Sequence, residues 1–209
     1  KEQGAIQTDV AFYAPGTEPQ REATPQLTEP FSGTLVVHLQ AGKDLKDADW
    51  MGKSDPYVVV GLPPGAGTAT LVEGGHPETE GGPPAPRTSA KDGTTAPVWD
   101  ERLTLAVDNV PPGTALQLSV FDEDGQTDTP LGVAQVPLDG ALLAAGEAAP
   151  AQWHPVHAVG ADGKPGKEQG AIQTDVAFYA PGTEPQREVT PELTEPFSGT
   201  LVVHLQAGK

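Results

Sequence analysis

The chain has 209 residues, of which 36% are hydrophobic, with 25 glycines, 23 prolines and no cysteine. The absence of cysteine excludes disulfides, thiolate metal sites and cysteine nucleophiles. The formal net charge of −17 disfavours nucleic acid and bare anionic membranes as partners, and it is tolerated best where cations neutralise part of it. No run approaches the roughly 20 apolar residues that span a bilayer, and no signal peptide opens the sequence.

The two ends of the chain carry nearly the same sequence. Residues 1–43 recur as residues 167–209 and differ at two positions only, Ala23 against Val189 and Gln26 against Glu192. The chain is therefore predicted to be slightly more than one period of a tandem array, in which each period is a complete domain with its linker. A sequence that begins within a repeat suggests a processed or partial product.

A polar, proline-rich segment separates the predicted repeats. TEPQREATPQLTEP has no hydrophobic periodicity, and segments of this composition form semi-rigid, extended connectors. The predicted organisation is a terminal edge strand of the preceding repeat, or a donated strand, at 1–16, a Pro/Thr/Glu-rich linker at 17–30, a β-domain at 31–181, a second linker at 182–196, and the first strand of the following repeat at 197–209.

Within residues 31–181, short apolar runs alternate with a period of two, which is typical of half-buried strands. Turn phrases such as PPG, DG and GG separate these runs, and only DGALLAAGEAA (139–149) has helical character, as a short helical loop. An antiparallel β-sandwich is therefore predicted. In chain order, its strands are expected at GTLVVHLQ (33–40), PYVVVGL (56–62), RLTLAV (102–107), LQLSV (116–120), LGVAQVPL (131–138) and AIQTDVAFY (171–179).

Four segments resemble, in the right order, the successive signatures of the C2 domain family. They are GTLVVHLQAGKDL (33–45), GKSDPYVVV (52–60), APVWDERLTL (96–105) and LQLSVFDEDG (116–125), the last followed by LG. The resemblance implies an all-β, eight-stranded, antiparallel C2-like sandwich, in the circular variant that starts at GTLVVHL and ends at AIQTDVAFY. The sequence departs from the family in a long Gly/Pro-rich insertion at 61–89 and in a compact third loop.

The resemblance also implies a calcium site. C2 domains of the calcium-binding kind carry aspartates on two loops at one end of the sandwich, and calcium takes roughly 6–8 oxygen ligands. Carried over residue by residue, the first loop supplies Asp49 and Asp55, and the third loop supplies Asp122, Asp124 and Asp128. These five would bind one or two calcium ions.

Other chemistry has little support in the sequence. FDEDGQTD resembles the opening of an EF-hand loop but lacks the glutamate that such a loop needs at its twelfth position. Ser54 and Ser119 have no plausible base in their sequence context, so no catalytic residue is predicted and the protein is not expected to be an enzyme. His38 falls on the polar face of its strand, where a solvated side chain is expected, and Trp99 is expected to pack at an edge of the sandwich.

Trp50 and Met51 form the predicted tip of the first loop and leave two functions open. An apolar tip suits insertion into a phospholipid bilayer, and it suits contact with another protein surface equally well. The strand face that often carries lysines in this family offers only Arg87 and Lys91.

The sequence favours a structural building block of an extracellular or cell-surface filament or stalk. Its partners would be other copies of itself, joined by strand addition in one version of the hypothesis, and calcium would stiffen the loop end. Threonines beside prolines in the linker are candidate sites for O-linked glycans. The alternative is a calcium-dependent phospholipid-binding module with a membrane as its partner.

Overall fold

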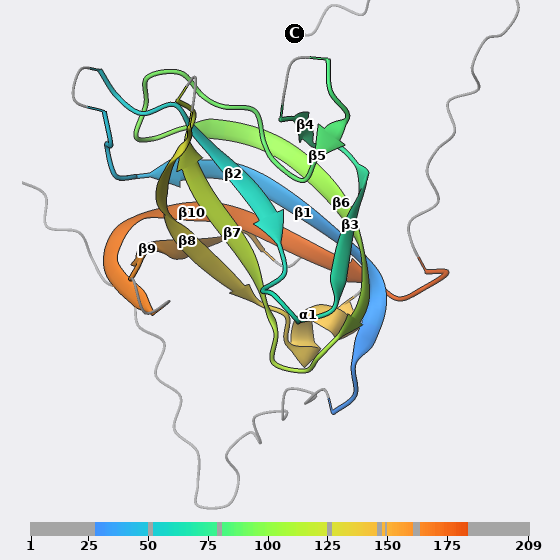
Figure 1. Cartoon of the computed structure of the whole chain (residues 1–209). Coiled ribbons are helices and arrows are strands. Elements are labelled where there is room, and N and C mark those ends of the chain that lie inside the picture. Colours follow the sequence, from blue (N-terminus) through green and yellow to red (C-terminus); the bar gives the residue numbers. More distant parts are fainter. Residues whose placement is uncertain are drawn as a thin grey trace, which may run out of the picture.

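A computed structural model describes residues 28–49, 52–78, 81–124, 127–145, 148, 150–160 and 164–183 (Figure 1). The predicted strand at 1–16, most of the linker at 17–30, nearly all of the linker at 182–196 and the strand at 197–209 lie outside these residues. The elements are β1 (Phe31–Lys43), β2 (Pro56–Gly61), β3 (Thr68–Glu73), β4 (His76–Pro77), β5 (Pro84–Ala85), β6 (Val98–Val110), β7 (Ala115–Asp122), β8 (Thr129–Pro137), α1 (Gly140–Ala145), β9 (Gln152–Val159) and β10 (Pro165–Tyr179).

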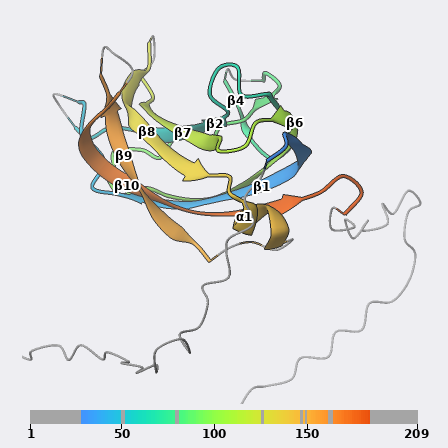
Figure 2. The same cartoon turned by 90° about the horizontal axis from the view of Figure 1, so that it is seen from below.

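Eight strands form one antiparallel sheet in the order β2-β7-β8-β9-β10-β1-β6-β3. The sheet curls so that its two halves lie face to face as the layers of a sandwich (Figure 2). Within this sheet, β8 and β9 share a single register pair, Val133 with His157. The predicted all-β antiparallel sandwich is confirmed, and the insertion at 61–89 contributes β3 to its edge together with the small β4–β5 pair.

The core is built from the alternation that the sequence displays. In β1, Leu35, Val37 and Leu39 are fully buried, because successive side chains of a strand point to opposite faces and these three share the inner one. The same alternation buries the inward-facing apolar residues of β6, β7 and β10. Trp99 is only 4% exposed and belongs to this core, where its Nε1–H donates to the carbonyl of Pro56 at 3.2 Å.

The sandwich is closed by a strand of the same chain. β10 pairs with β1 from Thr34 opposite Tyr179 to Lys43 opposite Ala171, and on its other side it pairs with β9. In the described residues, the strand that closes the sandwich therefore comes from the same chain, and strand addition by residues 1–16 to a neighbouring domain stays a prediction.

His38 is not the solvated histidine that its place on the polar face of β1 predicted. Its side chain is 12% exposed, and its ring bridges two carboxylates on the neighbouring strands. Nε2 lies 2.7 Å from Oδ1 of Asp100 in β6, and Nδ1 lies 3.0 Å from Oδ2 of Asp175 in β10. Strand alternation gave the correct face, but the carboxylates come from residues 62 and 137 positions away in the chain.

The one described helix, α1, lies at the end of the sandwich away from the loop that follows β1 (Figure 1). Asp139 caps it, because its Oδ1 accepts the backbone N–H of Leu142 at 3.0 Å. Leu142 and Leu143 pack against the core. Among the described residues, no helix is long and apolar enough to cross a membrane.

Candidate metal centre

Strand pairing brings the first and third loops together at one end of the sandwich. The first loop leads from β1 into β2, and the third loop leads from β7 into β8. β2 and β7 are antiparallel neighbours in which Pro56 lies opposite Asp122, so the end of the first loop meets the start of the third. The N–H of Asp55 donates to Oδ1 of Asp122 at 2.6 Å, and the N–H of Glu123 donates to the carbonyl of Asp55 at 3.1 Å.

Three of the five predicted aspartates form one carboxylate cluster. One carboxylate oxygen from each of Asp49, Asp122 and Asp124 lies within 4.8 Å of the other two. Asp49 is exposed, Asp124 is half-buried and Asp122 is only 1% exposed. This set of oxygen donors could hold a metal ion, and hard cations such as calcium prefer such donors.

Asp122 is the anchor of this cluster and also its least satisfied member. Its Oδ1 accepts the N–H of Asp55, but its Oδ2 is buried and has no hydrogen-bond partner among the described residues. Buried polar atoms are nearly always paired, because leaving one unpaired costs about 1–3 kcal/mol. An unpaired carboxylate oxygen beside two further carboxylates fits a site that is completed by a cation.

The electrostatics of Asp49 agree with this arrangement. Although the residue is exposed, neighbouring loop atoms displace part of the water around its carboxylate, and this desolvation raises its pKa above the ordinary value of 3.8. Repulsion from the other carboxylates, first that of Asp122 and then that of Asp124, raises the pKa further. A cation within the cluster would oppose both effects, so that metal binding and deprotonation of Asp49 are coupled.

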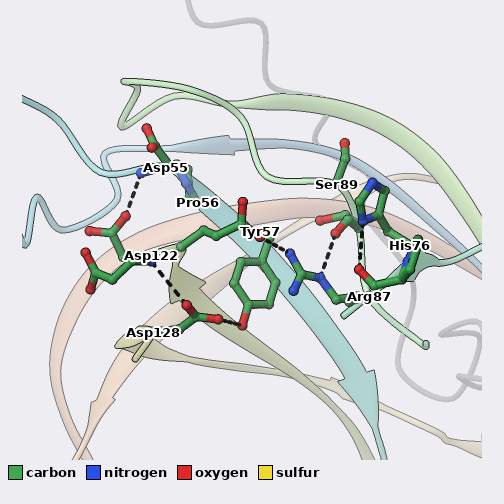
Figure 3. Close-up of polar contacts among 12 residues, drawn as sticks. Asp55, Pro56, Tyr57, His76, Arg87, Ser89, Asp122 and Asp128 are labelled. Carbon is green, nitrogen blue, oxygen red and sulfur yellow. Dashed lines mark hydrogen bonds and ion pairs between the residues drawn. The ribbon is translucent and has the colours of Figure 1, made fainter. Parts of the chain in front are cut away.

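Asp55 and Asp128, which the C2 resemblance implied as ligands, lie at this end of the sandwich but outside the three-residue cluster. Oδ1 of Asp55 accepts the N–H of Gly93 at 2.5 Å. Asp128 uses both of its oxygens, because Oδ2 accepts the hydroxyl of Tyr57 at 2.6 Å and Oδ1 accepts the N–H of Asp124 at 3.1 Å (Figure 3). In this structure the two residues hold the loops that position the cluster.

A packed group of side chains supports the third loop, and sequence reasoning did not identify it. The ring of Tyr57 stacks on Phe121 with centroids 5.6 Å apart, and the guanidinium carbon of Arg87 lies 3.6 Å from the centre of the Tyr57 ring. Burial, followed by the hydrogen bond to Asp128, raises the pKa of Tyr57, so its hydroxyl keeps the proton that it donates. The SDPY motif located Tyr57, but nothing in the sequence indicated these partners.

The two cations predicted for the strand face are both engaged by carboxylates. Nη2 of Arg87 lies 2.6 Å from Oε1 of Glu123, and Arg87 is only 5% exposed. Nζ of Lys91 lies 3.2 Å from Oε1 of Glu101. This face therefore offers little uncompensated positive charge.

Trp50 and Met51, the predicted tip of the first loop, lie outside the described residues. Their role at an interface or a membrane stays a prediction. The described parts of the loop reach Asp49 on one side of the tip and begin again at Gly52 on the other.

The fold and the cluster define a β-sandwich with a candidate metal centre at its loop end, and sequence comparison places it in a family. The C2 domain family model matches residues 33–156, more than half of the chain, and the chain belongs to this family. The family resemblance seen in the four sequence segments is thereby confirmed.

An individual protein is also similar to part of this chain. Synaptotagmin-4 of Arabidopsis thaliana is 30% identical over 131 residues, which cover 59% of this chain and 20% of that protein. The chain thus spans about one fifth of the length of this relative.

Among solved structures, the C2 domain A of plant Extended Synaptotagmin 1 is 18% identical with a TM-score of 0.49, covering 72% of this chain and 96% of that one. The calcium-bound C2 domains A and B of Extended-Synaptotagmin 2 are 19% identical with a TM-score of 0.46, covering 71% of this chain and 46% of that one.

Proposed function

We propose that the domain is a calcium-dependent phospholipid-binding module and acts as a binding module rather than as an enzyme. The observation that carries this proposal is the cluster of Asp49, Asp122 and Asp124 at the loop end of a C2 domain, with the buried Oδ2 of Asp122 unpaired. Membership of the C2 family and the synaptotagmin relative support this function better than the filament that the sequence favoured.

The three aspartates of the cluster have different tasks in this proposal. Asp122 is fixed by the N–H of Asp55, so it provides a rigid ligand at the base of the site. Asp124 is held by the hydroxyl of Thr129, which donates to its Oδ2 at 2.6 Å. Asp49 is exposed and completes the site from the first loop. When bound, calcium would neutralise these carboxylates and offer coordination positions to lipid oxygens.

Trp50 and Met51 have a natural place in this proposal. They follow Asp49 directly in the sequence, so membrane contact at the cluster would bring them to the bilayer surface. A tryptophan has an apolar body and one polar N–H, which suits the boundary between lipid headgroups and acyl chains.

The test is co-sedimentation of the full chain with phosphatidylserine-containing vesicles, with calcium and with a chelator. Binding is expected with calcium only, and the variant Asp122→Asn should lose it. Asp139→Asn, which changes the helix cap at the other end of the sandwich, should bind as the unmodified protein does. Equal binding in calcium and in chelator would contradict the proposal.

A second candidate function is a structural repeat of an extracellular or cell-surface filament, and it rests on the near-identity of residues 1–43 and 167–209. Copies this similar suit an assembly of regular geometry. Electron microscopy of the native material, before and after chelation, separates this candidate from the first. A fibre that shortens or disassembles without calcium would support it, and monomeric, dispersed particles under both conditions would oppose it.

A further inference from the structure

A hollow lined by lysines borders the start of the first loop, which also carries Asp49 of the candidate metal centre. It has a volume of about 410 Å³ and is formed where the end of β1 passes the start of β10. Lys43, Lys46 and Lys167 line it, together with the carboxylates of Asp44 and Glu168. All three lysines are exposed, and their charges exceed those of the two carboxylates.

The backbone holds this hollow open against the first loop. The N–H of Lys46 donates to the carbonyl of Gln169 at 3.3 Å, and the side-chain amide of Gln169 donates to the carbonyl of Leu131 at 2.8 Å. Gly170 has φ +105, and an added Cβ would lie 2.6 Å from the carbonyl oxygens of Lys43 and Asp44. Glycine at position 170 therefore lets β10 pack directly against the end of β1, and the three lysines line the hollow formed there.

Two lysines of the hollow differ from the cations of the strand face because no carboxylate among the described residues pairs with them. Among the described residues, no ion pair engages Lys46 or Lys167, whereas Arg87 and Lys91 contact Glu123 and Glu101. Lys46 is also only three residues from Asp49. The hollow is therefore close enough to the metal centre to contact the same membrane surface.

The surroundings of the hollow favour a membrane over a small soluble anion. Trp153 is 41% exposed, and Nζ of Lys43 lies 4.1 Å from the centre of its ring. Lys46 and Gln169 also line a second hollow of about 360 Å³, whose walls include the apolar residues Leu131 and Val159. Exposed tryptophan, lysines and apolar surface side by side are typical of the boundary between headgroups and acyl chains.

We propose that the hollow lined by Lys43, Lys46 and Lys167 binds the phosphate of an anionic phospholipid headgroup while the neighbouring aspartate cluster holds calcium. The inference rests on the proposed membrane function and adds a second contact that selects anionic lipid. A headgroup that carries a phosphomonoester binds most tightly, because it presents more negative charge to the lysines than a phosphodiester does.

The test compares two variants with equal loss of charge, Lys46→Gln/Lys167→Gln in the hollow and Lys91→Gln/Arg102→Gln, with Lys91 in the connection before β6 and Arg102 in β6. Binding of each full chain is measured in calcium to vesicles of phosphatidylcholine alone, with phosphatidylserine, and with phosphatidylinositol phosphate. A lysine near a membrane surface contributes about fivefold in affinity, so the first variant should bind the phosphatidylinositol phosphate vesicles roughly 25-fold more weakly. The second variant should stay within about twofold of the unmodified chain.

Calcium binding without vesicles, measured by calorimetry, should be the same in both variants, which shows that the metal centre is intact. Inorganic phosphate at the concentration of the lipid phosphate should not displace the chain from vesicles. Displacement would assign the hollow to a soluble phosphate and overturn the proposal. If the hollow variant binds vesicles as tightly as the unmodified chain, this inference alone fails. If the unmodified chain binds no vesicle in calcium, the proposed function fails and the inference fails with it.

Discussion

Replacement of Asp122 by asparagine should make the domain more stable than the unmodified protein without calcium and less stable than it with calcium. The side chain of Asp122 is buried and clusters with the carboxylates of Asp49 and Asp124. Its Oδ1 accepts an N–H, and its Oδ2 has no hydrogen-bond partner among the described residues. Asparagine keeps the size and the acceptor at Oδ1. It replaces the unpaired oxygen by an amide group that can donate to Asp49 or Asp124.

The size of the effect follows from the cost of the unpaired oxygen. Removing an unsatisfied buried acceptor restores about 1–3 kcal/mol. For a domain of this size, each kcal/mol shifts Tm by about 2–4 °C, so the metal-free variant should melt roughly 2–12 °C above the unmodified protein. With calcium at about one thousand times its Kd, the unmodified protein gains about 4.1 kcal/mol and the variant gains little, which reverses the order.

Thermal unfolding followed by circular dichroism, in chelator and in calcium, tests this reasoning. Asp139→Asn is the matched control, because it makes the same chemical change at an N-cap where the two residues are equivalent. The reasoning is refuted if the metal-free Asp122→Asn variant melts at or below the unmodified protein. It is refuted equally if calcium raises the Tm of both proteins by the same amount.

Three further predictions concern the loops and the strand crossing. Asp128→Asn should weaken calcium binding, measured by calorimetry, much less than Asp122→Asn does, because protein donors occupy both oxygens of Asp128; an equal loss would make Asp128 a ligand. The raised pKa of Asp49 predicts that the metal-free domain loses stability as pH rises from about 4 through that raised pKa, since the protonated carboxyl is favoured in the folded state. Denaturant unfolding of the metal-free protein and of Asp49→Asn should show this loss in the former and not in the latter. Gly170→Ala should lower the urea midpoint of unfolding more than Gly113→Ala does. Both substitutions place alanine at positive φ, which costs about 1–2 kcal/mol of folding free energy. Of these two positions, only Gly170 has backbone atoms within 3 Å of the added Cβ. Equal midpoints would show that the crossing of β1 and β10 relaxes freely.

The fold was predictable because strand periodicity is a local property of the sequence. Leu35, Val37 and Leu39 alternate with polar residues, and the structure buries all three completely. The insertion at 61–89 was harder to read, because its glycines and prolines hide the β3 strand at the sheet edge. β3 is mostly exposed, so it lacks the apolar alternation that reveals the inner strands.

The aspartates of the candidate metal centre were predictable from the sequence, but the hydrogen bonds between the loops around it were not. Asp49, Asp122 and Asp124 were named from the family pattern, and the pairing of β2 with β7 brings them together. For Asp55 and Asp128 the sequence could not show that Gly93 and Tyr57 donate to their carboxylates. Such hydrogen bonds depend on where distant loops lie, and spacing along the chain does not encode that. The lysine hollow could not be predicted either, because Lys167 in β10 is far from Lys43 and Lys46 in the sequence.

The sequence of the strand that pairs with β1 occurs twice in this chain, so β1 could pair with either copy during folding. Residues 1–13 have the same sequence as residues 167–179 of β10, so β1 has two candidate partners with identical side chains. Closing the short connection of residues 14–30 costs about 2 kcal/mol less chain entropy than closing the long one of residues 44–166. The nearer copy also emerges first during synthesis, whereas the farther copy is tied to β9 and forms the sheet of this structure. Residues 1–160 by themselves contain the strands β1 to β9 preceded by a copy of the sequence of residues 167–179, so the sequences of the same strands occur in this chain in two orders.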